Sequence, residues 1–316
     1  MRGMILAAGL GTRLRPLSYE LPKPIIPVLG RPLCTYNMEF LAKAGVKAFV
    51  LNLHRQPKLI QQRVTGWAGK KIRVDYTVEP EILGTGGGIR NAMGFFSSGT
   101  FATANSDTVV RFPFGPALSF HREKKAQATL VLFPDPEKRY TPVWTDDTGR
   151  ITGFGSDPGS GTRSGFYTGF QIVEPGLLLR IPPGRATCII RDTYTPLVKE
   201  RGPVFGYVSS GYFRDFGSPA DYLSGTLALL SERSAESAPP APSAAGVRIT
   251  PPVYISPGAK ISPGAIIGPD AVIEEGAAVA EGATVTRSIL WPGAVLGPGQ
   301  ALSGAILTPR RLVPVP

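Results

Sequence analysis

The sequence predicts an α/β protein: a mostly parallel sheet with helices on both faces, followed by a small β-helix. Strand-like apolar segments alternate with helix-like segments through the first half of the 316 residues. Near the C-terminus, branched residues recur at every sixth position instead. Strands that alternate with helices pair in parallel and place helices on both faces of the sheet. The chain is longer than one compact core usually serves, so two domains are expected.

The alternation locates the elements of the first half in chain order. The expected strands are Met4–Ala8, Ala48–Leu53, Ile72–Val78, Thr100–Asn105 and Ala128–Phe133. The helical patterns between them are Leu33–Ala44, Lys58–Trp67, Gly88–Phe96 and Pro116–Lys124. Later come strands at Phe166–Val173, Pro203–Ser209 and Tyr212–Phe216, and a last helix at Pro219–Leu230. In such sheets, ligands bind beyond the carboxyl ends of the strands.

The C-terminal part changes character after a stretch rich in Pro, Ala and Ser at 231–247, which is typical of a linker. Beyond it, the six-residue period is carried by Ile255, Ile261, Ile267, Ile273, Val279 and Val285. This period favours a solenoid of short parallel strands over a helix. We expect an α/β domain at 1–230, the linker at 231–247, the β-helix at 248–308 and a tail at 309–316.

The amino-acid composition narrows the classes of partner that the protein can bind. The chain has 34 Lys and Arg against 23 Asp and Glu, a net charge of +11, which favours anionic ligands. Like charges form no long run, so small anions fit better than nucleic acid or a membrane surface. Only Cys34 and Cys188 occur, which argues against a disulfide framework. The first apolar run is too short for a signal peptide, and no segment reaches membrane-spanning length. We therefore expect a cytoplasmic protein.

The first strand leads into a segment that has the properties of a phosphate cradle. Gly9 and Gly11 follow the strand and can take φ values that other residues avoid, so that backbone N–H groups converge on an anion. Arg13 and Arg15 add guanidinium groups that match phosphate oxygens in pairs. Lys23 lies between two prolines that stiffen the backbone around it. Glycines after a strand are a weak signal alone, and the added cations strengthen it.

These residues resemble the signature of the sugar-1-phosphate nucleotidyltransferases. The resemblance covers about residues 1 to 230 and rests on five segments in family order: Leu6–Pro16 with Pro22–Pro24, Leu83–Gly88, Asn105–Asp107, Tyr167–Phe170 and Asp215–Pro219. It implies a Rossmann-like catalytic domain and a left-handed hexapeptide β-helix. It also implies that a nucleoside triphosphate and a sugar 1-phosphate react to form a nucleotide-diphosphate sugar and pyrophosphate, with Mg²⁺ as the cofactor.

The resemblance also implies roles for individual residues. Catalytic roles fall to Arg13, Lys23, Asp107 and Asp215, of which the two aspartates are the expected metal ligands. Nucleotide binding falls to Leu6, Ala7, Ala8, Gly9, Gly11, Thr12, Arg13, Gly84, Thr85, Gly86, Gly87 and Asn105. Binding of the sugar phosphate falls to Lys23, Glu81, Arg163 and Gly169. Arg163 enters because many relatives have a Glu-Lys-Pro lysine in this region, whereas this chain has none.

The substrate stays open at this point. The domain order and the segment Ser288–Gly293 resemble bacterial mannose-1-phosphate guanylyltransferases. The segment Gly84–Ile89 is closer to N-acetylmuramate-1-phosphate uridylyltransferases and heptose-phosphate guanylyltransferases. A non-catalytic regulatory paralogue that binds the nucleotide sugar is an alternative of another class. The β-helix makes a homo-oligomer plausible, whereas acyl transfer does not fit, because no histidine follows His121.

Overall fold

The computed structural model describes residues 1–69, 71–96, 99–157, 159, 162–234 and 245–315, and of Arg163 only the backbone. These residues form two compact units. The first comprises Met1–Leu10, Pro22–Pro24 and Leu33–Phe213. The second comprises Gly11–Leu21, Ile25–Pro32 and Arg214–Pro316. The N-terminal signature is therefore divided between both units. The domain boundaries expected above stay predictions.

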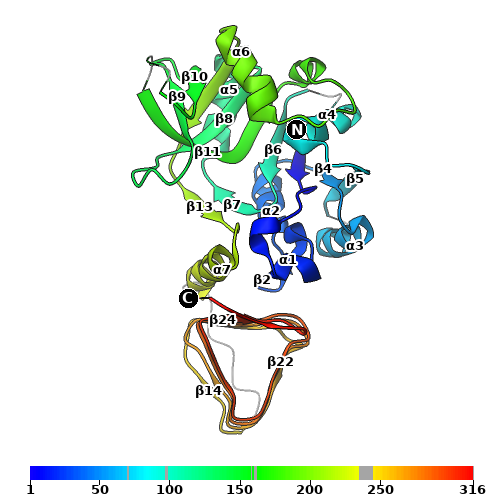
Figure 1. Ribbon diagram of the computed structural model, residues 1–316, viewed down its shortest axis with the longest axis vertical. Helices are drawn as coiled ribbons and strands as arrows, with labels where there is room; N and C mark the ends of the chain where they lie inside the picture. Colours follow the sequence, from blue (N-terminus) through cyan, green and yellow to red (C-terminus); the bar gives the residue numbers. More distant parts are fainter. Residues whose placement is uncertain (70, 97–98, 158, 160–161, 235–244, 316) are drawn as a thin grey trace. The chain divides into compact units, whose positions relative to one another are not determined.

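The first unit is built on a 9-stranded sheet (Figure 1). Its strands are β1 (Arg2–Leu6), β4 (Ala48–Leu53), β5 (Arg73–Val78), β6 (Phe101–Asn105), β8 (Ala128–Phe133), β9 (Pro142–Thr145), β10 (Ile151–Phe154), β11 (Thr162–Val173) and β12 (Val204–Val208). The parallel half runs in the order β6-β1-β4-β5, and β11 pairs antiparallel with β6, β8 and β9. The carboxyl ends of the parallel strands lie at one edge, where the candidate site begins.

The remaining elements connect the strands. The helices are α2 (Thr35–Lys43), α3 (Pro57–Ala68), α4 (Gly84–Asn91), α5 (Phe114–Glu123) and α6 (Thr195–Lys199), with 3-10 helices η3 (Met93–Phe96) and η4 (Pro175–Arg180) and the π-helix η5 (Ile189–Tyr194). The short strand β7 (Thr108–Arg111) follows β6, and β13 (Tyr212–Asp215) and the 3-10 helix η2 (Lys23–Ile25) join the two units in sequence.

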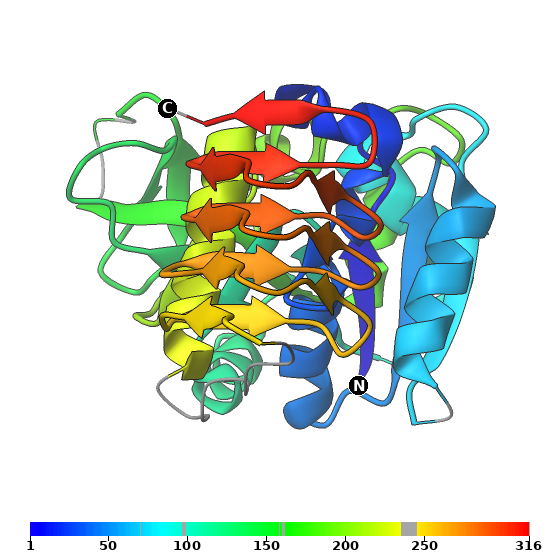
Figure 2. The same cartoon turned by 90° about the horizontal axis from the view of Figure 1, so that it is seen from below.

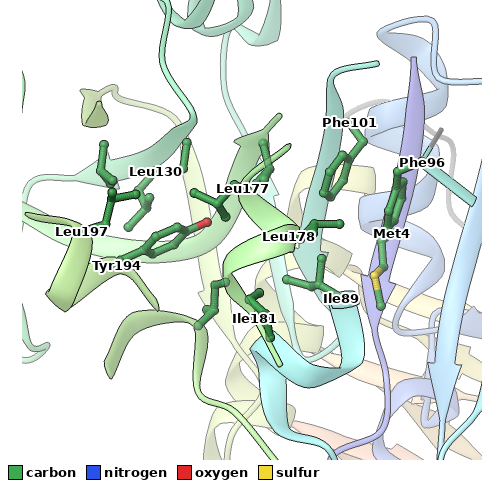
Figure 3. Close-up of a cluster of buried hydrophobic side chains, with 14 of the residues drawn as sticks. Met4, Ile89, Phe96, Phe101, Leu130, Leu177, Leu178, Ile181, Tyr194 and Leu197 are labelled. Carbon is green, nitrogen blue, oxygen red and sulfur yellow. The ribbon is translucent and has the colours of Figure 1, made fainter. Parts of the chain in front are cut away.

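Helices cover both faces of this sheet, as predicted. One face carries the cluster drawn in Figure 3, in which Met4 lies with Ile89 of α4, and Phe96 stacks on Phe101 at a centroid distance of 3.8 Å. Side chains alternate along a strand, so Phe170 of β11 points to the opposite face. There its ring lies 5.9 Å from that of Phe40 in α2. The predicted α/β class is confirmed, with a sheet that is part parallel and part antiparallel.

Several element bounds differ from the expectation, and for two of them the reason is identifiable. β1 ends at Leu6 and not at Ala8, because the Ala7 N–H donates to the Asn52 side chain, 2.9 Å away, and not to a neighbouring strand. α4 begins at Gly84 and not at Gly88, so the glycine-rich run forms the first turns of the helix and not a loop before it. The expected bounds of β4 and β8 are confirmed.

The second unit contains the β-helix and α7 (Pro219–Ser234), together with η1 (Thr12–Leu14), α1 (Leu17–Glu20) and the hairpin strands β2 (Pro27–Val28) and β3 (Arg31–Pro32). The coils of the β-helix are triangular in Figure 1 and stack one above another in Figure 2. Their sides are β14-β17-β20-β23, β15-β18-β21-β24-β25 and β16-β19-β22. Nearly all pairs are parallel; β25 pairs antiparallel with β24. The predicted β-helix is confirmed.

The bounds of these strands show how short each side is. They are β14 (Arg248–Ile249), β15 (Val253–Ile255), β16 (Lys260–Ile261), β17 (Ile266–Ile267), β18 (Ala271–Ile273), β19 (Ala278–Val279), β20 (Thr284–Thr286), β21 (Ser288–Leu290), β22 (Val295–Leu296), β23 (Ala301–Ser303), β24 (Ala305–Leu307) and β25 (Leu312–Pro314). The predicted stacking of branched residues is present, since Ile267 pairs with Val285 and Ile273 with Leu290. These side chains fill the interior of the coils.

One side of the β-helix is covered by α7. The middle residues of three successive strands point outward on this side and are fully buried: Val272, Ile289 and Ile306. α7 contacts β15 and β24 of the same side. The helix continues to Ser234, past the start of the expected linker. Residues 235–244 of that linker lie outside the described part of the chain. Among the helices that are described, none is long and apolar enough to cross a bilayer.

Candidate active site

The loop after β1 has the features expected of a phosphate cradle. Gly11 adopts a φ of 63° and precedes the 3-10 turn η1, which carries Arg13. Gly9 does not take a left-handed φ, contrary to the expectation, and a Cβ added there would meet no described atom within 4 Å. The described structure thus gives no packing reason for glycine at this position. Close approach of a ligand to the backbone would account for a glycine at this position.

Lys23 and Asp107 form an ion pair in the first unit. The Lys23 ammonium lies 2.8 Å from Asp107 Oδ2 and is 7% exposed, whereas the aspartate is 27% exposed. Asp107 follows β6, whose last residue Asn105 is held from α2, because Asn37 donates through Nδ2 to the Asn105 carbonyl at 2.9 Å. A buried lysine paired with a partly exposed aspartate places a fixed cation beside a carboxylate at the strand edge.

Arg13 and Asp215 form a second ion pair, in the second unit. Arg13 Nη1 lies 3.8 Å from Asp215 Oδ2, and the arginine is 70% exposed. A Cβ at Gly217 would come within 2.9 Å of Arg13 Nη1 and 3.0 Å of Asp215 Oδ2, so glycine makes room for the pair. The turn is then closed by a capping box, in which Ser218 and Asp221 hydrogen-bond each other at the start of α7.

Arg15 has a different environment from Arg13. Its guanidinium lies over the ring of Tyr19, 5.3 Å from the centroid, in the same unit. Such a cation–π contact stabilises the loop between η1 and α1. Of the two arginines in the signature, Arg13 is the one paired with an aspartate from a distant part of the sequence.

The glycine-rich start of α4 packs against a later segment of the first unit. Gly86 and Gly87 donate their N–H groups to the Thr187 carbonyl at 2.8 and 3.3 Å, and Thr187 donates to the Leu83 carbonyl. A Cβ at Gly84 would lie 2.7 Å from the Thr187 carbonyl oxygen. Thr85 Oγ1 accepts the N–H of Ile189, where η5 begins. The glycines therefore serve this close contact, and their role in base binding stays a prediction.

Sequence reasoning missed a buried polar network beneath this helix. Glu79 is 1% exposed, accepts a hydrogen bond from Asn52 Nδ2 at 2.7 Å through Oε1, and accepts the Leu83 N–H at 2.9 Å through Oε2. Asn52 accepts in turn from the Ala7 N–H. The network thus ties the end of β1 to the start of α4. An asparagine inside the otherwise apolar strand Ala48–Leu53 was the available signal.

The predicted residues for the sugar phosphate have separate environments. Gly169 adopts a φ of 81°, and a Cβ there would lie 2.4 Å from Asn105 Nδ2, so both features require glycine. Glu81 is exposed between β5 and α4, unlike the neighbouring Glu79. The side chain of Arg163 lies outside the described residues, although its backbone pairs with Trp144 in β9. Binding of the sugar phosphate by these residues stays a prediction.

Comparison with known proteins places the chain in a family. The sequence profile described as "Nucleotidyl transferase" matches residues 2–232. The chain belongs to this family. Among curated nucleotidyl transferases, it is 30% identical over 229 residues to the mannose-1-phosphate guanylyltransferase of Mycobacterium tuberculosis. It is 33% identical over 239 residues to the mannose-1-phosphate guanyltransferase of Yarrowia lipolytica.

These matches leave part of each nucleotidyl transferase uncovered. They span 72% and 74% of this chain but only 64% and 65% of the two relatives. Among solved structures, HddC from Yersinia pseudotuberculosis in complex with GMP-PN matches with a TM-score of 0.62 at 26% identity. That match covers 72% of this chain and 99% of HddC. The similarity to the family therefore involves the whole of that solved chain and most of this one.

The carboxylates present fit a magnesium ion of the kind that binds with its substrate. Mg²⁺ prefers oxygen ligands, and in phosphate-transfer sites it is bound through one or two carboxylates plus substrate phosphates and water. Within the described residues there is no cluster of three or more His, Cys, Asp or Glu that could hold a metal alone. Asp107 and Asp215 are both partly exposed, at 27% and 21%. Each of these carboxylates is accessible, which suits a ligand to an ion that also binds substrate and not a closed protein cage.

Proposed function

We propose that this protein is a sugar-1-phosphate nucleotidyltransferase. A phosphate oxygen of the sugar 1-phosphate would attack the α-phosphorus of a nucleoside triphosphate; the bond between the α- and β-phosphates would break, and pyrophosphate would leave. The observation that carries the proposal is the formation of two cation–carboxylate pairs, Lys23 with Asp107 and Arg13 with Asp215. In each pair, a cation of the N-terminal signature meets an aspartate from a distant segment.

The side chains of this protein would act by position and charge. Arg13, the exposed cation on η1, would bind the oxygens of the departing pyrophosphate. Backbone N–H groups around Gly9, Gly11 and Thr12 would hold the same phosphates. Lys23 is fixed beside Asp107 and would lie against the α-phosphate and the incoming sugar phosphate. No covalent nucleophile is needed, because such groups stabilise the charge that develops in the transition state.

Mg²⁺ would be held by Asp107 and Asp215. When bound, the ion neutralises phosphate charge while two anions approach each other. Its identity as magnesium is part of the proposal, since other hard divalent cations also take oxygen ligands.

GTP and mannose 1-phosphate are the substrates that we propose first. Support comes from the two curated relatives compared above, which are named as a mannose-1-phosphate guanylyltransferase and a mannose-1-phosphate guanyltransferase. The solved relative crystallised with GMP-PN gives further support for a guanine nucleotide. N-acetylmuramate 1-phosphate with UTP, or another sugar phosphate, is the alternative, because the lysine that many relatives use for the sugar phosphate is missing here.

The test is pyrophosphate release from the purified chain with Mg²⁺. The four ribonucleoside triphosphates and dTTP are each offered mannose, glucose, N-acetylglucosamine, N-acetylmuramate and heptose 1-phosphates. We expect release with GTP and mannose 1-phosphate. Asp107→Asn and Asp215→Asn should each reduce it by about 10²-fold or more. Asp75→Asn is the matched control, because Asp75 is 39% exposed and pairs with Arg73 on the same strand, β5.

The other outcomes decide between the alternatives. Release with a different pair of substrates would keep the reaction and replace the substrate. If no pair of substrates gives pyrophosphate release and the protein nevertheless binds a nucleotide sugar, the regulatory paralogue is favoured. Full activity in both aspartate variants would show that Asp107 and Asp215 are not the metal ligands.

The location and the oligomeric state of the protein are also part of the proposal. Cys34 and Cys188 form no disulfide, which supports a reducing, cytoplasmic location. We also propose self-association through the β-helix, because Val295 is 64% exposed on the side formed by β16, β19 and β22. Sedimentation of the wild type and of Val295→Glu tests this proposal: we expect an oligomer and a monomer, respectively, and the same state in both proteins would show that this side is not an interface.

A further inference from the structure

The β-helix has a column of buried polar side chains at one of its corners. Glu274, Trp291 and Thr308 each follow directly after a strand of the same sheet, β18, β21 and β24. Parallel pairing aligns the last residues of these strands, Ile273 with Leu290 and Leu290 with Leu307, so the three residues lie one above another. They are only 1%, 1% and 2% exposed. We call these three residues the corner column.

Glu274 binds the turn of the β2–β3 hairpin. Its Oε1 and Oε2 accept the Gly30 N–H at 3.2 and 3.0 Å. The two turn residues, Leu29 and Gly30, have φ values of 50° and 84°. A left-handed φ is unfavourable for leucine, so this turn needs an external partner. The buried carboxylate supplies it, because it accepts a backbone N–H that the turn directs outward.

Thr308 binds the end of α1. Its hydroxyl donates to Glu20 Oε1 at 2.8 Å, and Arg311 Nε lies 2.8 Å from the same oxygen. Glu20 is 8% exposed, so this contact is largely shielded from water. α1 follows η1 directly, and η1 carries Arg13.

Trp291 reaches the same hairpin through α7. Its indole N–H donates to the Tyr222 hydroxyl at 2.9 Å, and this hydroxyl donates to the Pro27 carbonyl at 2.6 Å. Tyr222 also packs near Phe216, with ring centroids 6.4 Å apart. Phe216 is fully buried and directly follows Asp215.

We propose that the corner column positions Arg13 and Asp215, so that the β-helix is needed for binding the triphosphate and not only for assembly. The column contacts two segments that follow η1 in sequence, α1 and the β2–β3 hairpin, and it contacts the helix that follows Asp215. All of these contacts lie within the second unit. The three residues are positioning residues, since none of them belongs to the predicted substrate contacts. The expected change in KM rests on the proposed function, whereas the expected change in amide hydrogen exchange does not.

The test compares Glu274→Gln with Glu275→Gln at pH 8. Both variants remove one negative charge from the same coil, but Glu275 is exposed and bonds to Ser256 and Gly258 within the β-helix. Amide hydrogen exchange of peptides from residues 11–32 is the structural readout. Steady-state kinetics with the nucleoside triphosphate, and the melting temperature, are measured on the same samples.

We expect Glu274→Gln to speed exchange in residues 25–32 and to raise KM for the triphosphate about 10- to 100-fold, the effect of a small misplacement of binding groups. Glu275→Gln should match the wild type. A lower melting temperature with unchanged KM and unchanged exchange would overturn the proposal and leave a merely structural role. Equal behaviour of the two variants would overturn it as well.

Two further measurements keep the proposal testable if Glu274→Gln does not fold or if the wild type shows no activity. If Glu274→Gln does not fold, Thr308→Val removes the hydroxyl that donates to Glu20 and should speed exchange in residues 17–21; unchanged exchange would overturn the proposal. If the wild type releases no pyrophosphate with any substrate pair, the proposed function fails. The exchange comparison still decides whether the corner column holds the segment, so the two failures are distinguishable.

Discussion

Lys23 is the residue whose environment is most informative about the reaction. A lysine that is 7% exposed and 2.8 Å from a carboxylate oxygen has lost most of its hydration and relies on that partner. We expect Lys23→Met, which keeps the length and removes the charge, to lower kcat/KM by about 10²- to 10³-fold. Pyrophosphate release at several triphosphate concentrations measures this change.

Lys43→Met is the control for that variant. Lys43 also pairs with a carboxylate, Glu39, but it lies on the surface of α2 and is 77% exposed. An exposed pair of this spacing contributes about 0.3–0.5 kcal/mol, so its loss should leave kcat/KM unchanged. A Lys23→Met enzyme as active as Lys43→Met would show that the buried ion pair only supports the fold.

Single residues also mark the limit of what the sequence could predict. Asp107 and Asp215 could be chosen as candidate metal ligands because each stands in a motif with a defined place in the chain; this role stays a prediction. Glu79 could not be singled out, since Glu81 stands two residues later in the same short segment and looks equivalent. Only the fold distinguishes them: it buries Glu79 against Asn52 and leaves Glu81 exposed.

At the scale of elements, α4 depends on the absence of side chains along its inner side. A Cβ at Gly88 would lie 2.6 Å from Asn52 Nδ2 and 2.8 Å from Glu79 Oε1, both of which are buried and hydrogen-bonded. We expect Gly88→Ala to reduce the free energy of unfolding by about 1–3 kcal/mol, the usual cost of overpacking. The midpoint of urea denaturation measures this loss.

Gly94→Ala provides a comparison nearby. Gly94 lies in η3, where an added Cβ would meet no described atom within 4 Å. Its φ is not left-handed, so alanine should be neutral or stabilising by up to about 1 kcal/mol. If Gly88→Ala were as stable as Gly94→Ala, the network of Asn52 and Glu79 would have to be adaptable and not fixed.

Elements differ in how far the local sequence determines them. β4 and β8 were predicted with their observed bounds because each is a largely apolar run that begins after a polar residue and ends at a break, His54 for β4 and Pro134 for β8. The β2–β3 hairpin was missed, since its turn places leucine where asparagine or glycine is usual. Its partner Glu274 lies far along the chain. The π-helix Ile189–Tyr194 was missed for a similar reason: its first N–H bonds to Thr85, in another element.

At the scale of the whole molecule, the second unit combines segments from both ends of the sequence. Gly11–Leu21 and Ile25–Pro32 belong with the β-helix, although they lie within the N-terminal signature. A reading of the linear sequence places the domain boundary after residue 230 and cannot foresee this combination. Stability of the second unit should therefore respond to charge at the contact between the hairpin and the β-helix.

The pH dependence of stability tests that expectation. Burial raises the pKa of Glu274 from 4.5 to about 7, although hydrogen bonds from the Gly30 and Leu29 N–H groups and the charge of Arg233 act in the opposite direction. Because the folded protein binds this proton more tightly than the unfolded chain, the stabilisation is fully present below pH 4.5 and is lost as the pH rises through 7.

The difference in unfolding free energy between wild type and Glu274→Gln isolates this effect, since the other groups titrate in both proteins. From pH 4.5 to 8, it should shift by about 3 kcal/mol in favour of the glutamine variant, the equivalent of the pKa change. Urea denaturation at several pH values gives the two curves. Parallel curves would mean that the Glu274 carboxyl titrates normally and that water reaches it at the corner of the β-helix.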